Sequence, residues 1–259
     1  MASADDSSPR RVQSIENAIE IIEYLESQDG ARLTDIAGHH NLAKATVHTQ
    51  LSTLEEHGFV AKDDDAYRVG LRLLELGEHA KNRLDIVDVA GPELDNLAKE
   101  TDTRTQLIVE ENGLAVCVYL ARGPNAILPP TDVGYREYLH CIASGKALLA
   151  HLPETRIEEI INQRGLPAKT DSTIDSTEGL LEELEQIRNQ GFAFNEQEKL
   201  RGLRAVGAPI LGQNGNPIGA ISISDTAENM SDEWFRDQLP QRLKTTANRI
   251  EINFSAQHH

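Results

Sequence analysis

Hydrophobic residues recur at helical spacing in the first quarter of the chain. Between residues 13 and 27 they fall on one predicted helix face, at Ile15, Ala18, Ile19, Ile22 and Leu25. A shorter helix is predicted at 35–40 with Thr34 as its N-cap, and a third helix at 43–57. Two short strand-like pieces follow, at 59–62 and 67–70. This order of helices and hairpin predicts a winged helix-turn-helix.

The hydrophobic pattern changes beyond residue 83. A connector helix is predicted over 71–83, and the helix predicted at 85–101 contains Gly91-Pro92, which should kink or split it. Strand-length apolar stretches then come in adjacent pairs around glycine-containing turns, at 104–122 and 204–224. Because these strands form hairpins, the sheet should be mainly antiparallel. Further helices are predicted at 144–152, 155–163, 177–191 and 232–254.

These patterns predict an α+β chain with four parts. Residues 1–11 form a polar lead-in that lacks the apolar stretch of a secretory signal, and we expect it to be disordered. The winged helix-turn-helix occupies 12–70, the linker helix 71–83, and a sheet domain 84–259.

The chain is strongly acidic, with 42 Asp and Glu against 25 Lys and Arg and a formal net charge of −17. The acids are spread along the chain, which is typical of proteins from salt-loaded halophile cytoplasms; an ordinary acidic protein is the alternative. No run of about 18 apolar residues occurs, so no membrane span is expected. Cys117 and Cys141 lack the number and spacing of a disulfide framework or a metal site. We therefore expect a cytoplasmic protein without a metal or other cofactor.

One polar, helix-patterned window is free of this acidity. No carboxylate occurs from Ile36 to Leu54, although residues 1–70 contain 6 basic and 13 acidic side chains, a net charge of −7. Within 43–52, Val47 and Leu51 turn inward with the following Leu54, and five polar side chains face outward: Lys44, Thr46, His48, Thr49 and Ser52. Short polar and cationic side chains of this kind read base edges in the major groove. Because the segment as a whole is not basic, composition alone leaves a protein-binding winged helix as the alternative.

The stretch "SIENAIEIIEYL…LTDIAGHHNLAKATVHTQLSTLEEHGFV" resembles the DNA-binding domain of IclR-type transcriptional regulators. The match to the recognition-helix run of that family comprises Lys44, Thr46, Val47, His48, Leu51, Thr53-Leu54, Gly58 and Val60. Ala45 replaces the family serine, and Thr49 replaces a usual arginine. Loss of the arginine removes a DNA contact, so the operator sequence of other family members cannot be assigned to this protein. The resemblance implies that double-stranded DNA is contacted by the outward face of 43–52, the lead-in and the wing. The expected contacts are Arg10, Arg11, Arg32, Lys44, Thr46, His48, Thr49, Ser52, Lys62 and Arg68.

The stretch "IGAISIS" at 218–224 alternates in the manner of a strand. Ile221 and Ile223 share one face, and Ala220, Ser222 and Ser224 share the other. The second face leaves room and hydrogen bonds for a ligand, or merely tolerates a half-exposed surface. A nearby carboxylate-free run carries three cations, which either favour a small organic anion or pair with surface acids: Lys199, Arg201 and Arg204.

The stretch "LHCIASGKALLAHLP" raises the possibility of an enzyme. We do not expect a phosphate-binding loop, because His140 stands where its first glycine belongs and Ala147 follows Lys146. Ser144 has candidate bases in Lys146 and His140 but no third orienting group, and a serine that opens a helix is commonly a cap. We do not expect an enzyme; a hydrolase that uses Ser144 or Cys141 is the alternative class.

Three stretches match the effector domain of IclR-type regulators in order: "GYREYLHCIASGKALLAHLP", "GFAFNEQEKLRGLRAVGAPI" and "PIGAISISD". The likeness implies a GAF-like domain, an antiparallel sheet flanked by helices that binds a small-molecule effector. Mapped by motif, the pocket is lined by Ala143, Ser144, Asn195, Leu203, Ala205, Ser222 and Ser224. Asn195 replaces a usual acidic residue and Ala205 a usual cysteine, so an anion would meet less repulsion here.

The resemblance as a whole covers roughly residues 12 to 254. It implies a ligand-responsive repressor or activator of metabolic genes. We expect a homodimer, assembled through the apolar side chains of 71–83, that can pair into a dimer of dimers.

Overall fold

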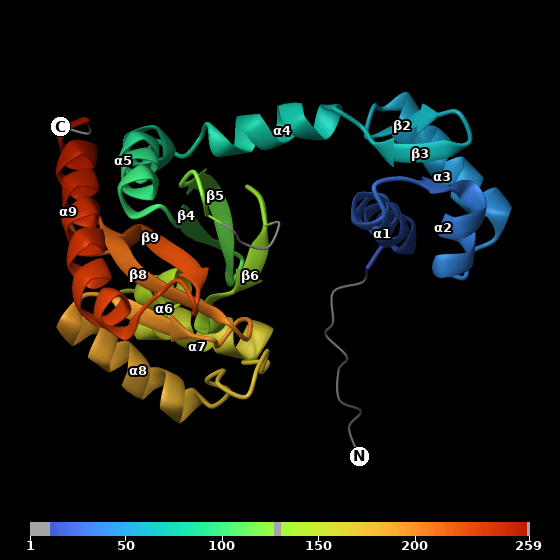
Figure 1. The fold of residues 1–259 in the computed structure, drawn as a ribbon. Helices are drawn as coiled ribbons and strands as arrows, with labels where there is room; N and C mark the ends of the chain where they lie inside the picture. The colour runs from blue at the N-terminus through green and yellow to red at the C-terminus, as the bar shows by residue number, and fades with distance from the viewer. Residues whose placement is uncertain (1–10, 127–130, 258–259) are drawn as a thin grey trace, which may run out of the picture. The chain divides into compact units, whose positions relative to one another are not determined.

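The computed structural model describes residues 11–126 and 131–257 and divides into two compact units, 1–80 and 81–259 (Figure 1). The boundary between them falls within the predicted linker helix. Hairpin-built sheets and flanking helices give the α+β class that the sequence predicts.

The first unit is a small helical domain with a three-stranded antiparallel sheet of order β1-β3-β2. Its elements are α1 (Gln13–Ser27), β1 (Ala31–Arg32), α2 (Leu33–His39), α3 (Lys44–Glu56), β2 (Val60–Asp63) and β3 (Ala66–Val69). Ile21 of α1, Ile36 of α2 and Val47 of α3 are fully buried together in its core. The β2–β3 hairpin is the predicted wing. These elements form the winged helix-turn-helix that the pattern predicts.

Two details of this unit differ from prediction. Ile15 and Ile19 are 58% and 51% exposed, because α1 turns Ile21 into the core together with the predicted Leu25. Thr34 is not an N-cap: β1 runs directly into α2, so Arg32 takes the cap position and Thr34 lies inside the first turn.

The helix α4 (Arg72–Lys81) occupies most of the predicted connector. Every residue of α4 is at least partly exposed. Leu71 just before it is 84% exposed, and Leu74 and Leu76 within it are 62% and 44% exposed. A helix of this kind keeps an apolar surface that its own unit does not cover.

The second unit contains a six-stranded antiparallel sheet of order β6-β5-β4-β9-β8-β7. The strands are β4 (Arg104–Glu111), β5 (Leu114–Arg122), β6 (Arg136–Tyr138), β7 (Ala193–Glu196), β8 (Leu203–Leu211) and β9 (Pro217–Thr226). The helices are α5 (Ile86–Thr101), α6 (Ala143–Leu149), α7 (Glu154–Arg164), α8 (Thr177–Gln190) and α9 (Leu239–Gln257), with short helical turns at Leu139–Cys141 and Trp234–Gln238. Both predicted hairpins are present, β4–β5 and β8–β9. Strands β6 and β7, of three and four residues, were not predicted from the sequence pattern.

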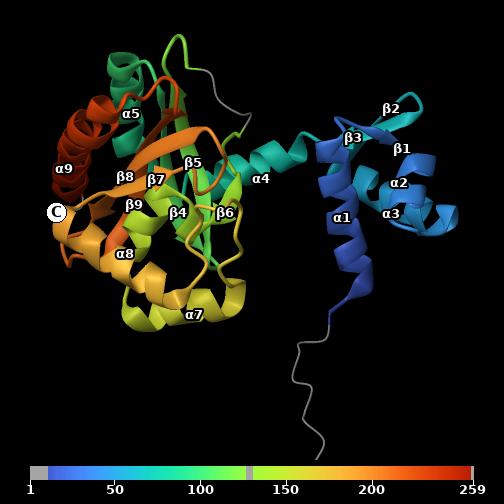
Figure 2. The same cartoon turned by 60° about the horizontal axis from the view of Figure 1, so that its bottom comes forward.

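Helices cover both faces of this sheet (Figures 1 and 2). On one face α5 and α9 pack against Leu107, Ile221 and Ile223, and on the other α6, α7 and α8 pack against Ile108 and Ala220. The predicted alternation of β9 is therefore confirmed.

The start of α6 rests directly on the sheet at Gly207 of β8. A Cβ atom there would lie 2.4 Å from the carbonyl carbon of Ala143 and 2.4 Å from the amide nitrogen of Ser144. Only glycine lets two backbones approach so closely. This contact places the first turn of α6 beside the polar face of β9.

The helix predicted over 85–101 is present as α5, and of the two predicted effects of Pro92, a kink or a split, the split does not occur. Pro92 removes the amide that would bond to the carbonyl of Asp88, and because Asp88 is exposed, water can satisfy that group. Gly91 is buried, and a Cβ there would lie 3.0 Å from the ring of Tyr119.

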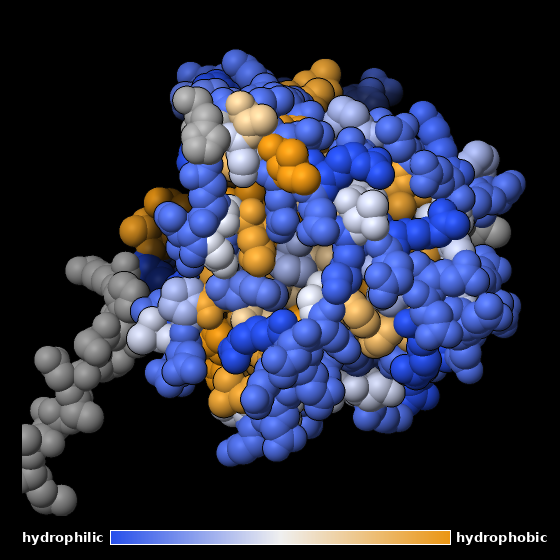
Figure 3. Space-filling view, turned by 90° about the vertical axis from the view of Figure 1, so that its left-hand side faces the viewer, coloured by the Kyte–Doolittle hydropathy of each residue, from blue (hydrophilic) through white to orange (hydrophobic). Residues whose placement is uncertain are grey.

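Hydrophilic residues cover most of the face of the molecule drawn in Figure 3. Among the described residues, no helix combines the length and apolar character needed to cross a membrane.

Candidate functional site

The helix α3 presents the side chains predicted to read DNA. Lys44, Thr46, His48, Thr49 and Ser52 are all exposed. Their helical neighbours Val47 and Leu51 are fully buried and Leu54 is half-buried, as the spacing predicts. The first turn of α3 contains no acidic residue. The polar face of α3 is therefore open to a partner.

The exposed side chains of α3 differ in their freedom to bond. The Thr49 hydroxyl donates to the carbonyl of Ala45 at 3.0 Å, so it can serve a ligand only as an acceptor. Lys44 makes no ion pair within 11–126 and 131–257, which leaves its ammonium group available.

The other predicted DNA contacts are more constrained. The Arg68 guanidinium lies 3.4 Å from Asp63 and 4.0 Å from Asp29, so it must leave two carboxylates to reach a phosphate. Lys62 is exposed beside the ring of Tyr67. Arg32 is exposed where β1 meets α2, and Arg11 is exposed 3.5 Å from Glu16. Arg10 lies outside the described residues.

A cavity of about 310 Å³ lies in the second unit, on the sheet face that α6 and α8 cover. Its wall contains all seven residues predicted from the effector motifs: Ala143, Ser144, Asn195, Leu203, Ala205, Ser222 and Ser224. Four adjoining strands bring several of them into one row, because Ser224 pairs with Arg104 and Ala205, and Ala205 pairs with Asn195.

The charged part of the wall was mostly missed by sequence reasoning. Arg104 and Gln106 of β4 line the cavity, and the alternation of that strand is the signal that could have found them. Tyr135, Glu137 and Lys169 also line it, but they come from an edge strand and loops without periodicity.

Of the three cations near the "GLR" segment, only Lys199 lines the cavity. The Arg201 guanidinium is 2.6 Å from Asp171, and that of Arg204 is 2.8 Å from Glu196 and 2.8 Å from Asp232. For these two arginines the alternative interpretation, pairing with surface acids, is correct.

Glu137 is the acceptor at the centre of the charged wall. Burial opposes its ionisation, but it accepts hydrogen bonds from the Tyr135 hydroxyl at 2.8 Å and the Tyr138 amide at 3.0 Å. The ammonium groups of Lys199 and Lys169 each lie 3.7 Å from one of its oxygens. Together these groups hold the pKa of Glu137 below its ordinary value. Glu137 is therefore ionised at neutral pH.

Several buried polar atoms of the wall have no hydrogen-bond partner among the described residues. They are Arg104 Nε, Thr131 Oγ1, Ser144 Oγ and Ser222 Oγ. Buried polar groups are nearly always paired in folded proteins. Water or a polar ligand within the cavity would pair these four atoms.

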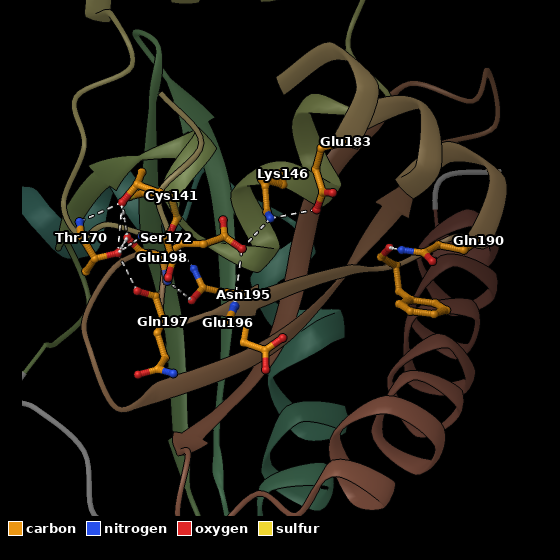
Figure 4. A network of polar contacts seen from close by, with 12 residues as sticks. Cys141, Lys146, Thr170, Ser172, Glu183, Gln190, Asn195, Glu196, Gln197 and Glu198 are labelled. Carbon is orange, nitrogen blue, oxygen red and sulfur yellow. Dashed lines mark hydrogen bonds and ion pairs between the residues drawn. The ribbon is translucent and has the colours of Figure 1, made fainter. Parts of the chain in front are cut away.

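A buried polar network holds the loops around this cavity (Figure 4). Lys146 of α6 is 1% exposed, and its ammonium group donates to Glu183 of α8 at 2.9 Å and to Glu198 at 2.8 Å. The amide of Glu198 donates to the Asn195 side chain at 3.2 Å, and Asn195 in turn donates to the carbonyl of Cys141 at 2.5 Å. The network thus ties the segment that carries Lys199 to α6 and α8.

The same region lacks the features of a hydrolase. Burial raises the pKa of Cys141 to about 12, and its thiol donates to the Tyr138 carbonyl at 3.2 Å. His140 Nε2 lies 3.2 Å from the Pro167 carbonyl, and burial lowers the pKa of this histidine. Ser144 has no base within hydrogen-bond distance in the part of the chain that the structure describes. No cluster of three or more metal-ligating His, Cys, Asp or Glu side chains occurs within 11–126 and 131–257.

Comparisons with known proteins agree with this architecture. Residues 14–64 match the IclR helix-turn-helix domain, and residues 78–252 match the "Bacterial transcriptional regulator IclR C-terminal" family. The chain is 32% identical over 253 residues to the "Probable HTH-type transcriptional regulator ArcR" of Halobacterium salinarum, covering 96% of both chains. It is 27% identical over 228 residues to the transcriptional repressor IclR of Escherichia coli, covering 86% of this chain and 83% of the repressor.

The structure is similar to solved members of the same family. The Thermotoga maritima IclR structure superimposes with a TM-score of 0.78 at 30% identity, covering 95% of this chain and 100% of that one. An IclR homolog from Microbacterium hydrocarbonoxydans, solved with 4-hydroxybenzoate, has a TM-score of 0.77 at 23% identity, covering 94% and 99% of the two chains. The families and relatives that match are transcriptional regulators and not enzymes, and the chain belongs to the IclR family of DNA-binding transcriptional regulators.

Proposed function

We propose that this protein is a ligand-responsive regulator that binds operator DNA through α3 and a small organic anion through the cavity of its second unit. Membership of the family carries the DNA-binding activity. The proposal that the protein binds an anionic effector rests on the cavity of about 310 Å³. The wall of this cavity contains Arg104, Lys169 and Lys199 beside unpaired serine hydroxyls. Cationic and hydroxyl donors around a small cavity suit carboxylate or sugar-acid ligands from metabolism. The regulated genes are accordingly metabolic genes.

On DNA, we propose that the exposed face of α3 enters the major groove. Lys44, Thr46, His48, Thr49 and Ser52 then contact bases and phosphates, and Arg10, Arg11, Arg32, Lys62 and Arg68 contact the flanking backbone. Two copies would read half-sites about one helical turn apart on a pseudo-palindrome.

We propose a homodimer as the functional unit. The exposed apolar side chains of Leu71, Leu74 and Leu76 supply an apolar surface along α4, and those of Ile15 and Ile19 add a second one on α1. Apolar surface of this extent is commonly covered by a partner. A dimer of dimers is the larger assembly that sedimentation would detect.

The effector acts by shifting an equilibrium between DNA-competent and DNA-incompetent arrangements of the dimer. It can do so only through a difference in affinity for the two arrangements. The network of Lys146, Glu198 and Asn195 links the cavity wall to α6 and α8, so a ligand that moves the wall also moves these helices.

We further propose that the protein works in the salt-rich cytoplasm of a halophile. The formal net charge of −17 and the similarity to a Halobacterium salinarum regulator support this proposal. A DNA-binding regulator acts where the chromosome is, which supports the cytoplasmic location.

The test is selection of genomic fragments with the purified full-length protein, followed by footprinting and a thermal-shift screen of small acids and sugars. We expect protection of a two-fold symmetric site that Lys44→Glu abolishes, because the substitution places a carboxylate against phosphates. Lys99→Glu, on the exposed side of α5, is the matched control and should leave the footprint intact. Failure to enrich any fragment at any salt concentration would instead favour a protein-binding winged helix.

A further inference from the structure

We propose that the effector of this cavity is an organic dianion whose two negative charges are bound by Arg104, Lys169 and Lys199. This inference rests on the proposed function, because it specifies the ligand of the same cavity. The described lining residues carry three cations and one carboxylate, Glu137, a net charge of +2. The whole chain has a formal net charge of −17, so the cavity wall has the opposite sign to the rest of the molecule.

Arg104 is the most isolated of these cations. It is 6% exposed, and its Nη2 donates to the Thr131 carbonyl at 3.0 Å while Nε has no partner among the described residues. The nearby Asp132 is 3.2 Å from Arg122. A buried guanidinium without a carboxylate is costly, and burial accordingly lowers the pKa of Arg104. One anionic group of a ligand would remove this cost.

The two lysines share a single carboxylate. Lys169 and Lys199 each lie 3.7 Å from an oxygen of Glu137, a distance beyond a good hydrogen bond, and Glu137 already accepts bonds from Tyr135 and Tyr138. One carboxylate balances only one of the two ammonium groups. Lys169 is exposed and Lys199 is half-buried, so solvent balances the second positive charge until an anionic group of the ligand replaces it.

The cations also come from different parts of the fold. Arg104 extends from strand β4 of the sheet, whereas Lys169 and Lys199 come from the loops that follow α7 and β7. The unpaired hydroxyls of Ser144 and Ser222 can donate to anionic oxygens in the same space. This arrangement favours a small ligand with two separate anionic groups over one with a single charge.

The test is calorimetric titration of the full-length protein at fixed salt with matched probes. Succinate, glutarate and adipate carry two separate carboxylates, glycerol 3-phosphate carries both charges on one group, and succinamate and glutaramate are monoanionic matches. We expect at least one dianion to bind about 10- to 100-fold more tightly than its monoamide, the effect of one charge-assisted hydrogen bond. Tightest binding of a dicarboxylate would identify the effector as a diacid, and tightest binding of glycerol 3-phosphate would identify it as a phosphate ester.

Variants separate this effect from a loss of folding. Glu137→Gln raises the wall to three net positive charges and should tighten dianion binding about tenfold, a gain that unfolding cannot produce. Arg104→Gln should weaken it about 10- to 100-fold, whereas Arg201→Gln, outside the cavity wall, should leave it unchanged.

Three results would overturn the proposal that the ligand is a dianion. The first is a monoamide that binds as tightly as its diacid, and the second is a Glu137→Gln variant that binds dianions no better than the unaltered protein does. The third is failure of every dianion to bind either the unaltered protein or the Glu137→Gln variant. If a dianion binds but leaves the operator footprint unchanged, the proposed regulatory function is wrong, whereas the inference that the cavity binds a dianion is still supported.

Discussion

The polar face of α3 and the effector cavity solve opposite physical problems. On α3 the polar side chains are exposed, and Lys44 and its neighbours make few contacts that would fix their positions. In the cavity Arg104 and the serine hydroxyls are buried, Lys199 is half-buried and only Lys169 is exposed, and a network of hydrogen bonds centred on Lys146 holds the segment that carries Lys199. A surface that must follow the shape of DNA can be left mobile, whereas a site for a small ion must be fixed before the ligand arrives. A substitution on the polar face of α3 should therefore affect only its own contact, whereas a substitution in the network around the cavity should affect several residues at once.

The largest expected effect breaks the buried network. Lys146→Met leaves Glu198 and Glu183 without their cation, and removing one partner of a buried ion pair costs about 3–5 kcal/mol. We expect the free energy of unfolding to fall by about this amount in a denaturant titration of the second unit. Lys99→Met, at an exposed position of α5, is the control. Equal stability of the two variants would show that the network contributes nothing to the fold.

A smaller effect tests the contact between α6 and the sheet. Gly207→Ala places a methyl group 2.4 Å from the backbone of Ala143, so α6 must move away. Overpacking of this kind costs about 1–3 kcal/mol. The same denaturant titration measures it, and anion affinity should fall in parallel because Ser144 moves with the helix. Gly212→Ala, in the same unit and without a positive φ, serves as the comparison for stability because the nearest atoms lie 3.6 Å from its added Cβ.

The salt dependence of operator binding tests how many phosphate contacts α3 and its surroundings make. Few cations surround this helix, so we expect log K against log[salt] to have a slope shallower than about −4 per dimer. Thr49→Arg supplies one more phosphate contact per subunit and should steepen the slope by about 0.9 for each. Filter binding across a salt series measures both. A slope near about −10 would reveal a basic surface that the described residues do not show.

The smallest effect concerns acidity. Because the pKa of Glu137 is held below its ordinary value in the folded state, its ionisation stabilises the fold above the unfolded carboxyl pKa of about 4.3. This contribution is lost as pH falls through the lower, folded pKa. Glu137→Gln should therefore flatten the acid limb of a stability–pH curve below about pH 4.3, and leave the curve above it parallel to that of the unaltered protein. An unchanged acid limb would contradict the ionised state inferred for Glu137.

Periodicity explains which parts of both sites were predictable from sequence. Helical spacing correctly assigned Val47 to the core and Lys44 to the surface, and strand alternation correctly placed Ile223 and Ser224 on opposite faces of β9, in the core and in the cavity wall. The cavity motifs came from resemblance to a family and not from periodicity.

The errors and omissions have physical causes as well. The helix α1 carries two apolar stripes, and spacing alone could not decide that Ile21 is buried while Ile19 is exposed. Lys169 and Glu137 reach the cavity from a loop and a three-residue edge strand, whose conformations depend on tertiary contacts and not on a local pattern. Pro92 was expected to kink or split α5, and no split occurs because packing of the helix outweighs the loss of one hydrogen bond.

The hydrogen bond from Asn195 to the carbonyl of Cys141 has a consequence for evolution at this position. The amide donates there at 2.5 Å and, through its oxygen, accepts from Glu198. An aspartate in its place would need to carry a proton to make the first of these contacts, and its charge state would respond to the acidity of the cell. The asparagine makes both contacts at any physiological pH, so this connection between the helical turn Leu139–Cys141 and strand β7 does not titrate.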